Sequence, residues 1–163
     1  MQLNPENVLK NIFVARAFNS DHQILLLDKV TEMVKNGEPI KLIVIDSLTA
    51  HFRAEFSGRG MLADRQQKLN KYLHNLMKLA ETCNLAIYVT NQVMANPGML
   101  FGDPTTAIGG NIVGHASTYR IYLRKGKKGS RVAKLIDAPN LPENETIFFL
   151  SEKGVSDEEA GGK

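Results

Sequence analysis

The chain has 163 residues, of which 43% are hydrophobic. That is enough to bury a core, so we expect one compact domain over residues 4–157 and a flexible tail over 158–163. Its single cysteine excludes an internal disulfide framework, and its net charge of +3 is too small to identify a partner. The sequence shows neither a secretion signal nor an apolar run of membrane-spanning length, so we expect a cytosolic protein without membrane contact.

The first half of the chain alternates between strand and helix patterns. Ile12–Ala17 is rich in apolar residues and predicts a short strand, and the amphipathic stretch His22–Lys35 predicts a helix. Lys41–Asp46 is a continuous, β-branched apolar run, which is typical of a parallel strand buried on both faces. The three- and four-residue spacing of apolar residues in Leu62–Cys83 predicts a long helix, and Leu85–Thr90 predicts a second buried strand. This order predicts an α/β fold with a mainly parallel sheet flanked by helices.

The second half has a different character. Residues 93–111 are rich in glycine and proline and lack periodicity, which predicts a long loop of functional importance or without fixed structure. Tyr119–Arg124, Val132–Asp137 and Thr146–Leu150 are strand candidates, and the glycine-containing turn between the first two predicts an antiparallel hairpin. We therefore expect an antiparallel element at the C-terminal end of the domain.

Polar side chains follow both predicted parallel strands. Asp46 and Ser47 come directly after the first, and Gln92 follows the second in the sequence VTNQ. A carboxylate at the carboxyl edge of such a sheet can help to hold Mg²⁺, and an amide beside it can bond to a terminal phosphate. An ordinary turn cap at Asp46 and a plain strand-to-loop transition at Gln92 are the alternatives.

Two basic regions are candidates for binding a polyanion. From Arg120 to Lys134 the sequence has many basic residues and no acidic one, which favours contact with a phosphate backbone over a merely solvated face. The glycine-punctuated segment FSGRG has Arg53 and Arg59 around it and Arg65 just beyond. Phe101, in the long loop, is the best candidate for stacking on a base. The four histidines show no zinc-ligand spacing.

Several of these segments occur together in one known family. The motifs KLIVIDSLTAHFRAEFSGRG, VTNQVMANPG, FGDPTTAIGGNIVGHAST and DAPNLP, in this order, resemble the RecA-type strand-exchange recombinases and are most similar to the archaeal RadA group. The resemblance extends from about Asn4 to Asp157. It implies a RecA-like ATPase core with an incomplete central sheet, because the chain contains no G-x-x-x-x-G-K-[ST] phosphate loop and no segment matching the family's catalytic glutamate.

The resemblance also implies roles in nucleotide binding. Asp46, with Ser47 beside it, is similar to the Walker B acid that holds Mg²⁺, and Gln92 is similar to the residue that senses the γ-phosphate of ATP. His115 is similar to the histidine that links the second DNA loop to the nucleotide. A cap over the ATP of a neighbouring subunit is implied for the segment that includes Asp137, Ala138, Pro139 and Pro142, and Asp137 is implied to contact a monovalent cation such as K⁺.

DNA and protein contacts are implied as well. Arg53–Leu62 resembles the first DNA-binding loop, with Arg59 and Arg65 facing the nucleic acid, and Val93–Asn111 resembles the second. The residues expected to bind single- and double-stranded DNA are Arg53, Arg59, Arg65, Phe101, Asn111, Arg124, Lys125 and Lys134. A pocket for a Phe-x-x-Ala segment, from an adjacent protomer in a filament or ring or from a mediator, is implied around Ala15, Ala17, Leu26, Val30 and Met33.

Two functions remain open from the sequence. In one, the chain is part of a RadA-like recombinase that binds single-stranded DNA, assembles into filaments and promotes ATP-dependent strand exchange. Without the phosphate loop, we expect it to bind no nucleotide tightly and to hydrolyse no ATP alone. In the other, it is a stand-alone DNA-binding or recombinase-modulating module that acts without ATP.

Overall fold

A computed structural model describes residues 3–95, 105–152 and 154–157, without the side chains of Arg59 and Ala95. The chain forms two compact units, Met1–Ile112 and Val113–Lys163, and each is described by itself. Among the described residues, none of the helices combines the length and the apolar character that a membrane span needs.

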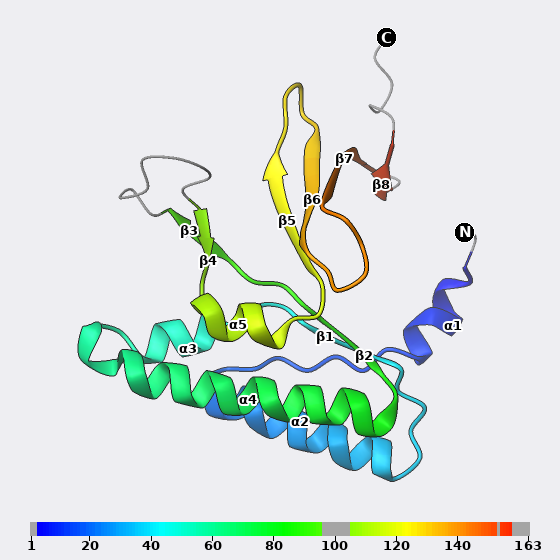
Figure 1. The fold of residues 1–163 in the computed structure, drawn as a ribbon. Coiled ribbons are helices and arrows are strands. Elements are labelled where there is room, and N and C mark those ends of the chain that lie inside the picture. The colour runs from blue at the N-terminus through cyan, green and yellow to red at the C-terminus, as the bar shows by residue number, and fades with distance from the viewer. Residues whose placement is uncertain (1–2, 96–104, 153, 158–163) are drawn as a thin grey trace. The chain divides into compact units, whose positions relative to one another are not determined.

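The first unit holds the helices and the parallel strands (Figure 1). Its elements in chain order are α1 (Pro5–Lys10), α2 (Ser20–Lys35), β1 (Leu42–Ile45), α3 (Ala50–Glu55), the 3₁₀ helix η1 (Arg59–Met61), α4 (Leu62–Cys83), β2 (Ala86–Val89), β3 (Val93–Ala95), β4 (Thr105–Ala107) and the start of α5 (Gly110–Ala116). The predicted helices over 22–35 and 62–83 are confirmed, and α1 and α3 were not predicted.

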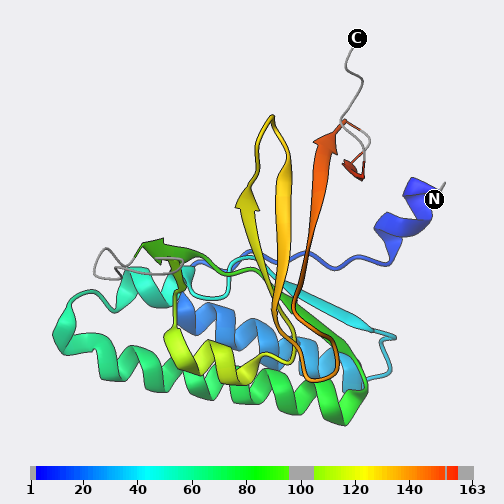
Figure 2. The ribbon, with the colours of Figure 1, turned by 45° about the horizontal axis from the view of Figure 1, so that its top comes forward.

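The core of this unit lies along α4. Its buried residues recur at helical spacing and face α2 and α3, and Phe52 of α3 and the nearby Leu48 are both fully buried. Asn84 ends α4 in the left-handed conformation, which asparagine tolerates better than most residues. Figures 1 and 2 show α2 and α4 side by side on one side of the β1–β2 pair. The buried residues of α4 are Leu69, Tyr72, Leu73, Leu76 and Leu79.

The strands β1 and β2 form the parallel pair that the sequence predicted, in a register from Leu42↔Ala86 to Ile45↔Val89. The prediction that these strands are buried on both faces was wrong. Leu42, Val44 and Tyr88 are each more than half exposed, whereas Ile43 and the other alternate residues are half-buried. Since α2 and α4 lie on the same side of the pair, these two helices cover one face of each strand, the face that carries the half-buried residues.

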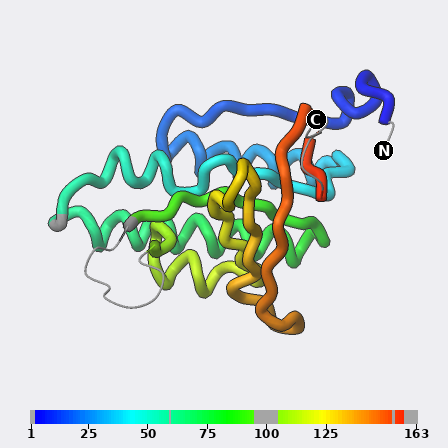
Figure 3. The backbone as a smooth tube through the Cα atoms, turned by 90° about the horizontal axis from the view of Figure 1, so that it is seen from above, coloured from blue at the N-terminus to red at the C-terminus, as the bar shows by residue number. Residues whose placement is uncertain are grey.

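The predicted strand over Ile12–Ala17 was also wrong. The segment has no regular secondary structure, and Figure 3 follows it from α1 to α2 as a stretched tube. A strand needs a neighbour that accepts and donates its backbone hydrogen bonds, and none of the described residues pairs with this segment. Its apolar side chains are therefore open to solvent, with Phe13 62% and Val14 89% exposed.

The ends of the expected loop over 93–111 are more regular than predicted. β3 and β4 pair antiparallel in the register Val93↔Ala107 to Ala95↔Thr105, and α5 begins at Gly110. Residues 96–104, including Phe101, lie outside the described residues. The two described ends of the expected loop therefore form a short antiparallel pair.

The second unit is a four-stranded antiparallel sheet in the order β5-β6-β7-β8, preceded by the rest of α5. Its strands are β5 (Arg120–Lys125), β6 (Arg131–Asp137), β7 (Asn144–Ser151) and β8 (Gly154–Ser156). The predicted hairpin is confirmed, and β8 is additional. The turn between β5 and β6 requires its glycines: a Cβ on Gly126 would meet the Ser130 hydroxyl at 2.2 Å, and Gly129 has a φ of +81°.

Candidate functional site

The carboxyl ends of β1 and β2 meet at one edge, as they must in a parallel pair. Asp46 follows β1, and Thr90 follows β2. The Thr90 hydroxyl donates to Asp46 Oδ1 at 2.5 Å, and the Thr90 amide donates to the Ile45 carbonyl at 3.0 Å. The structure thus holds one carboxylate oxygen in place on an exposed aspartate, at the edge where α/β proteins bind ligands.

Asp46 and Ser47 are suited to a metal ion that takes its other ligands from water and from a bound phosphate group. Ser47 follows a cis peptide bond, and its hydroxyl is buried with no hydrogen-bond partner among the described residues. In the same residues, no three His, Cys, Asp or Glu side chains gather as a metal site. One carboxylate and one hydroxyl fit Mg²⁺, which keeps several waters and takes the remaining oxygens from phosphates.

Gln92 lies on the same edge, two residues after Thr90, with its side chain exposed. Its backbone carbonyl accepts the Ile108 amide at 2.9 Å. The predicted sensor residue is therefore attached by its own backbone to the segment that ends the β3–β4 hairpin. Asp46 and Gln92 both border this edge, as the strand order predicted.

Asn91, between Thr90 and Gln92, has a connecting role that the sequence analysis did not single out. The Thr49 hydroxyl donates to Asn91 Oδ1 at 2.7 Å, and Asn91 Nδ2 donates to the Ile108 carbonyl at 2.6 Å. Its position inside VTNQ, directly after an apolar strand pattern, was the only signal in the sequence.

The first candidate DNA loop, Arg53–Leu62, comprises the end of α3, η1 and the start of α4. Arg53 is exposed on α3, and Arg65 is half-buried in the first turn of α4. Arg59 begins η1, but its side chain is outside the described residues. The fold thus places all three arginines on or beside the loop, and their contact with nucleic acid stays a prediction.

A cluster of polar and charged side chains ties α3 and α4, the helices on either side of this loop, to α2. The Ser20 amide donates to Glu55 Oε1 at 2.6 Å, and its fully buried hydroxyl bonds the other oxygen of that carboxylate. Lys68 on α4 donates to the same hydroxyl at 2.7 Å, pairs with Asp21 at 2.8 Å and lies over the ring of Phe56. The end of α3 and the second turn of α4 are thereby tied to the start of α2.

The residues predicted beyond the second loop lie on α5. Asn111 and His115 are both exposed there. His115 belongs to the second unit, whereas Gln92 belongs to the first, so a link between the histidine and the nucleotide stays a prediction.

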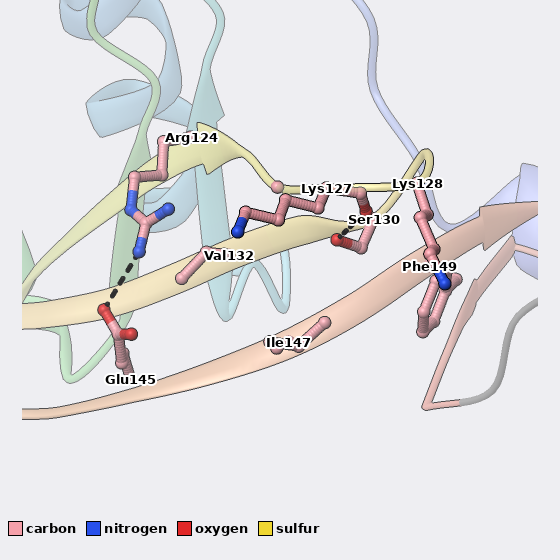
Figure 4. A pocket seen from close by; sticks show the side chains of 9 residues that line it. Arg124, Lys127, Lys128, Ser130, Val132, Glu145, Ile147 and Phe149 are labelled. Atoms are coloured by element: carbon pink, nitrogen blue, oxygen red, sulfur yellow. Dashed lines mark hydrogen bonds and ion pairs between the residues drawn. The ribbon is translucent and has the colours of Figure 1, made fainter.

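The basic hairpin carries its charges on β5, β6 and their turn, but two of them pair with acids from later in the chain. One acid is Glu145 on β7 (Figure 4), and the other is Glu143, which directly precedes β7. Arg124 Nη2 lies 3.3 Å from Glu145 Oε2, and Lys134 Nζ lies 3.3 Å from Glu143 Oε2. The local run of bases gave no sign of these acids, because the pairing of β6 with β7 brings Glu145, and the residue before the strand, Glu143, from later in the chain. For Lys125 the described residues provide no ion pair.

An open hollow of about 380 Å³ lies on the same sheet. Figure 4 shows Lys127 and Lys128 on the turn above it and apolar side chains of β6 and β7 below. Its lining residues are Arg124, Gly126, Lys127, Lys128, Ser130, Val132, Glu145, Ile147 and Phe149. The combination of cations and apolar surface suits a single-stranded nucleic acid, whose phosphates are charged and whose bases can stack.

The predicted cap begins where β6 ends. Asp137 Oδ2 accepts both Arg120 Nη2 at 2.7 Å and Arg120 Nε at 3.1 Å. Of the following cap residues, Ala138 is half-buried, and Pro139 and Pro142 are exposed. A monovalent cation at Asp137 would have to share the carboxylate with a guanidinium, whose charge weakens such a site.

The residues predicted to receive a Phe-x-x-Ala segment remain at least partly accessible. Ala15 is exposed and Ala17 half-buried in the segment before α2, and Leu26, Val30 and Met33 are half-buried on α2. The three helical residues are spaced to share one face. Their use by a partner stays a prediction.

Two comparisons with known proteins test the family resemblance. The sequence model of the Rad51 family matches residues 1–158 of the chain. The DNA repair and recombination protein RadA of Methanocorpusculum labreanum (strain ATCC 43576 / DSM 4855 / Z) is 57% identical to the chain over 155 residues. The match covers 93% of this chain and 47% of that protein, so the chain spans about half the length of the relative. Both findings confirm the resemblance and the RecA-like fold class.

Proposed function

The chain belongs to the Rad51 family, and on that premise we propose that it is the DNA-facing part of a RadA-type DNA repair and recombination protein. One observation supports this most strongly. Asp46, Gln92 and the bases of both candidate DNA loops are joined by hydrogen bonds at one edge of the parallel pair. A change at the nucleotide therefore has a short bonded route to the loops.

In nucleotide binding, Asp46 and Ser47 supply oxygens to Mg²⁺ or to its waters, and Gln92 bonds to the γ-phosphate. These residues would hold Mg²⁺–ATP, which when bound would supply the phosphoryl group for transfer to water, and the metal would neutralise charge on the phosphates. The chain contains no G-x-x-x-x-G-K-[ST], so the residues that cradle the phosphates come from another polypeptide segment. Alone, the chain turns over no ATP.

In DNA binding, the two loops and the basic sheet contact the phosphate backbone of single-stranded DNA and of the duplex with which it exchanges strands. Arg53, Arg59 and Arg65 act from the first loop, and Phe101 and Asn111 act from the second. Arg124, Lys125 and Lys134 act from the sheet. The support is the accessible cationic surface around the β5–β6 turn, where Lys125, Lys127 and Lys128 are all exposed.

Assembly into filaments or rings uses two further surfaces. The segment from Asp137 to Pro142 covers the ATP of a neighbouring protomer, His115 reports on that nucleotide, and K⁺ binds weakly at Asp137 beside Arg120. Ala15, Ala17 and the apolar face of α2 accept a Phe-x-x-Ala segment from a protomer or mediator. We place this assembly in the cytosol.

A second candidate is a DNA-binding or recombinase-modulating module that works without ATP. It is favoured by the exposed bases around the β5–β6 turn, which lie on a sheet that carries none of Asp46, Ser47 and Gln92. The two proposals differ in whether ATP changes the affinity for DNA once a phosphate loop is supplied by another polypeptide.

Titration of the chain against a fluorescent single-stranded oligonucleotide, with and without ATP and Mg²⁺, tests the DNA proposal. We expect salt-sensitive binding, with log K falling by about 0.7 per contacted phosphate for each unit of log salt. Binding absent even at low salt would sink both candidates. If adding the part of RadA that this chain does not match makes the affinity depend on ATP, the recombinase assignment is favoured over the module.

A further inference from the structure

The Asn91 side chain is held at both ends by segments that lead into different loops. At one end, Thr49 immediately precedes α3, which continues into the first candidate DNA loop. At the other, Ile108 immediately follows β4, which closes the second. Thr49 is 3% and Ile108 5% exposed, so both contacts are largely shielded from water. A hydrogen bond lost at such a site leaves a polar group without its partner.

Chemistry fixes the orientation of the amide. The Ile108 carbonyl can only accept, so Asn91 must direct Nδ2 towards it, at 2.6 Å. That leaves Oδ1 for the Thr49 hydroxyl, at 2.7 Å. Both ends of the side chain are therefore used, and by segments that do not adjoin in sequence.

The Thr49 hydroxyl does not cap its own helix. Thr49 occupies the N-cap position of α3, where a threonine side chain commonly accepts a backbone N–H of the first turn. Here it makes no such capping bond. Its hydroxyl is directed to Asn91, so the start of α3 depends on the strand end rather than on its own cap.

Backbone bonds run beside the side-chain bridge. The Leu48 amide donates to the Thr90 carbonyl at 2.9 Å, and the Ile108 amide donates to the Gln92 carbonyl at 2.9 Å. The two loop bases are thus attached to Thr90 and Gln92, two residues apart in the segment after β2. Between them, Asn91 is a side chain bonded to both.

We propose that Asn91 is a positioning residue that couples the two loop bases, so that a change at one loop alters the stability of the other. The proposal rests on the proposed function for its meaning, since only loops that bind DNA make the coupling useful. Both bonds form only when the Thr49 hydroxyl and the Ile108 carbonyl stand a fixed distance apart. Asn91 therefore holds the loops in one relative arrangement beside Gln92.

Amide hydrogen exchange of the whole chain, followed by NMR without DNA, tests the coupling. Thr49→Val removes the hydroxyl with little change of shape. We expect it to speed exchange of the Ile108 amide, on the far side of Asn91, by about 2- to 10-fold, the size of one lost hydrogen bond. Thr49→Ser should restore the wild-type rate. Thr82→Val is the matched control, because the Thr82 hydroxyl bonds only within its own helix, to the Lys78 carbonyl.

Asn91→Ala provides the second arm. It should speed exchange at Ile108 and in the first turn of α3 together, and adding Thr49→Val should produce no further effect at Ile108. If Thr49→Val speeds exchange only in α3 and leaves Ile108 at the wild-type rate, the coupling is refuted. The Thr49 variants decide the matter even if Asn91→Ala does not fold.

Single-stranded DNA affinity of the same variants separates this proposal from the proposed function. Asn91→Asp keeps the acceptor for Thr49 but sets a carboxylate oxygen against the Ile108 carbonyl. We expect it to weaken DNA binding although it removes no basic residue. Coupling present in exchange, together with unchanged DNA affinity, would uphold the role of Asn91 and contradict DNA binding by the loops.

Discussion

Glu145→Gln should increase the affinity of the chain for single-stranded DNA. In the structure the Glu145 carboxylate lies 3.3 Å from the Arg124 guanidinium, so a DNA phosphate has to compete with it for the same cation. The two side chains are 53% and 44% exposed, and solvent therefore screens the pair. Such exposed pairs contribute about 0.2–1 kcal/mol, which corresponds to an affinity gain of about 1.4- to 5-fold.

The assay is fluorescence anisotropy of a labelled oligonucleotide at about 50 and 200 mM salt. Glu152→Gln is the control: it removes the same charge from an exposed residue for which the described residues provide no ion pair. Arg124→Ala should weaken binding and flatten the salt dependence by about 0.7 in log–log slope. Equal gains for Glu145→Gln and Glu152→Gln would reduce the effect to net charge, and a loss of affinity in Glu145→Gln would refute the competition.

Three further predictions concern stability. Ser20→Ala removes the hydroxyl that bonds Glu55 and should lower the free energy of unfolding by about 1–3 kcal/mol in urea denaturation; a change below about 0.5 kcal/mol would contradict that role, since substitutions without a buried partner stay in that range. Phe52→Ala, at a fully buried side chain, should cost about 3–5 kcal/mol, whereas Phe13→Ala, at a side chain that is 62% exposed, should cost far less; similar losses would mean that the core lies elsewhere. Burial raises the pKa of Tyr72 above its ordinary value of 10.0, so its share of the stability is intact below that value and is lost as pH rises through the folded-state pKa. The Tm of thermal unfolding should therefore fall less steeply between about pH 9 and 11 in Tyr72→Phe than in the wild type. Parallel curves of Tm against pH would argue against a raised pKa.

The helices and strands with a clear apolar pattern of their own could be predicted from the sequence. The apolar spacing from Leu62 to Cys83 gave the bounds of α4, and the apolar runs before Asp46 and Thr90 gave β1 and β2 to within a residue or two. Ile12–Ala17 failed because its apolar, β-branched composition suits a strand, but the composition says nothing of whether a neighbour is present to pair with it. The six-residue α3 escaped notice because it depends on burial of Phe52 rather than on its own capping.

The candidate site shows the same contrast between residues set by their own segment and residues set by contacts with other segments. Asp46 and Gln92 could be predicted because polar residues after adjacent parallel strands must border one edge. Asn91 and the acids Glu143 and Glu145 could not, because their partners Thr49, Ile108, Lys134 and Arg124 come from other segments through register and turn geometry. Sequence thus predicted which residues border this edge better than which residues hold or neutralise the charged side chains.

Reconstitution of ATP hydrolysis tests the central claim most directly. The chain is mixed with the part of the Methanocorpusculum labreanum RadA that it does not match, co-elution is verified, and phosphate release is measured with and without single-stranded DNA. We predict that neither piece hydrolyses ATP alone, that the complex does so faster with DNA, and that Asp46→Asn lowers the rate at least about 10-fold, as loss of a positioned metal contact would. Failure to co-elute, a co-eluting complex without DNA-stimulated hydrolysis, or full activity in Asp46→Asn would contradict the account.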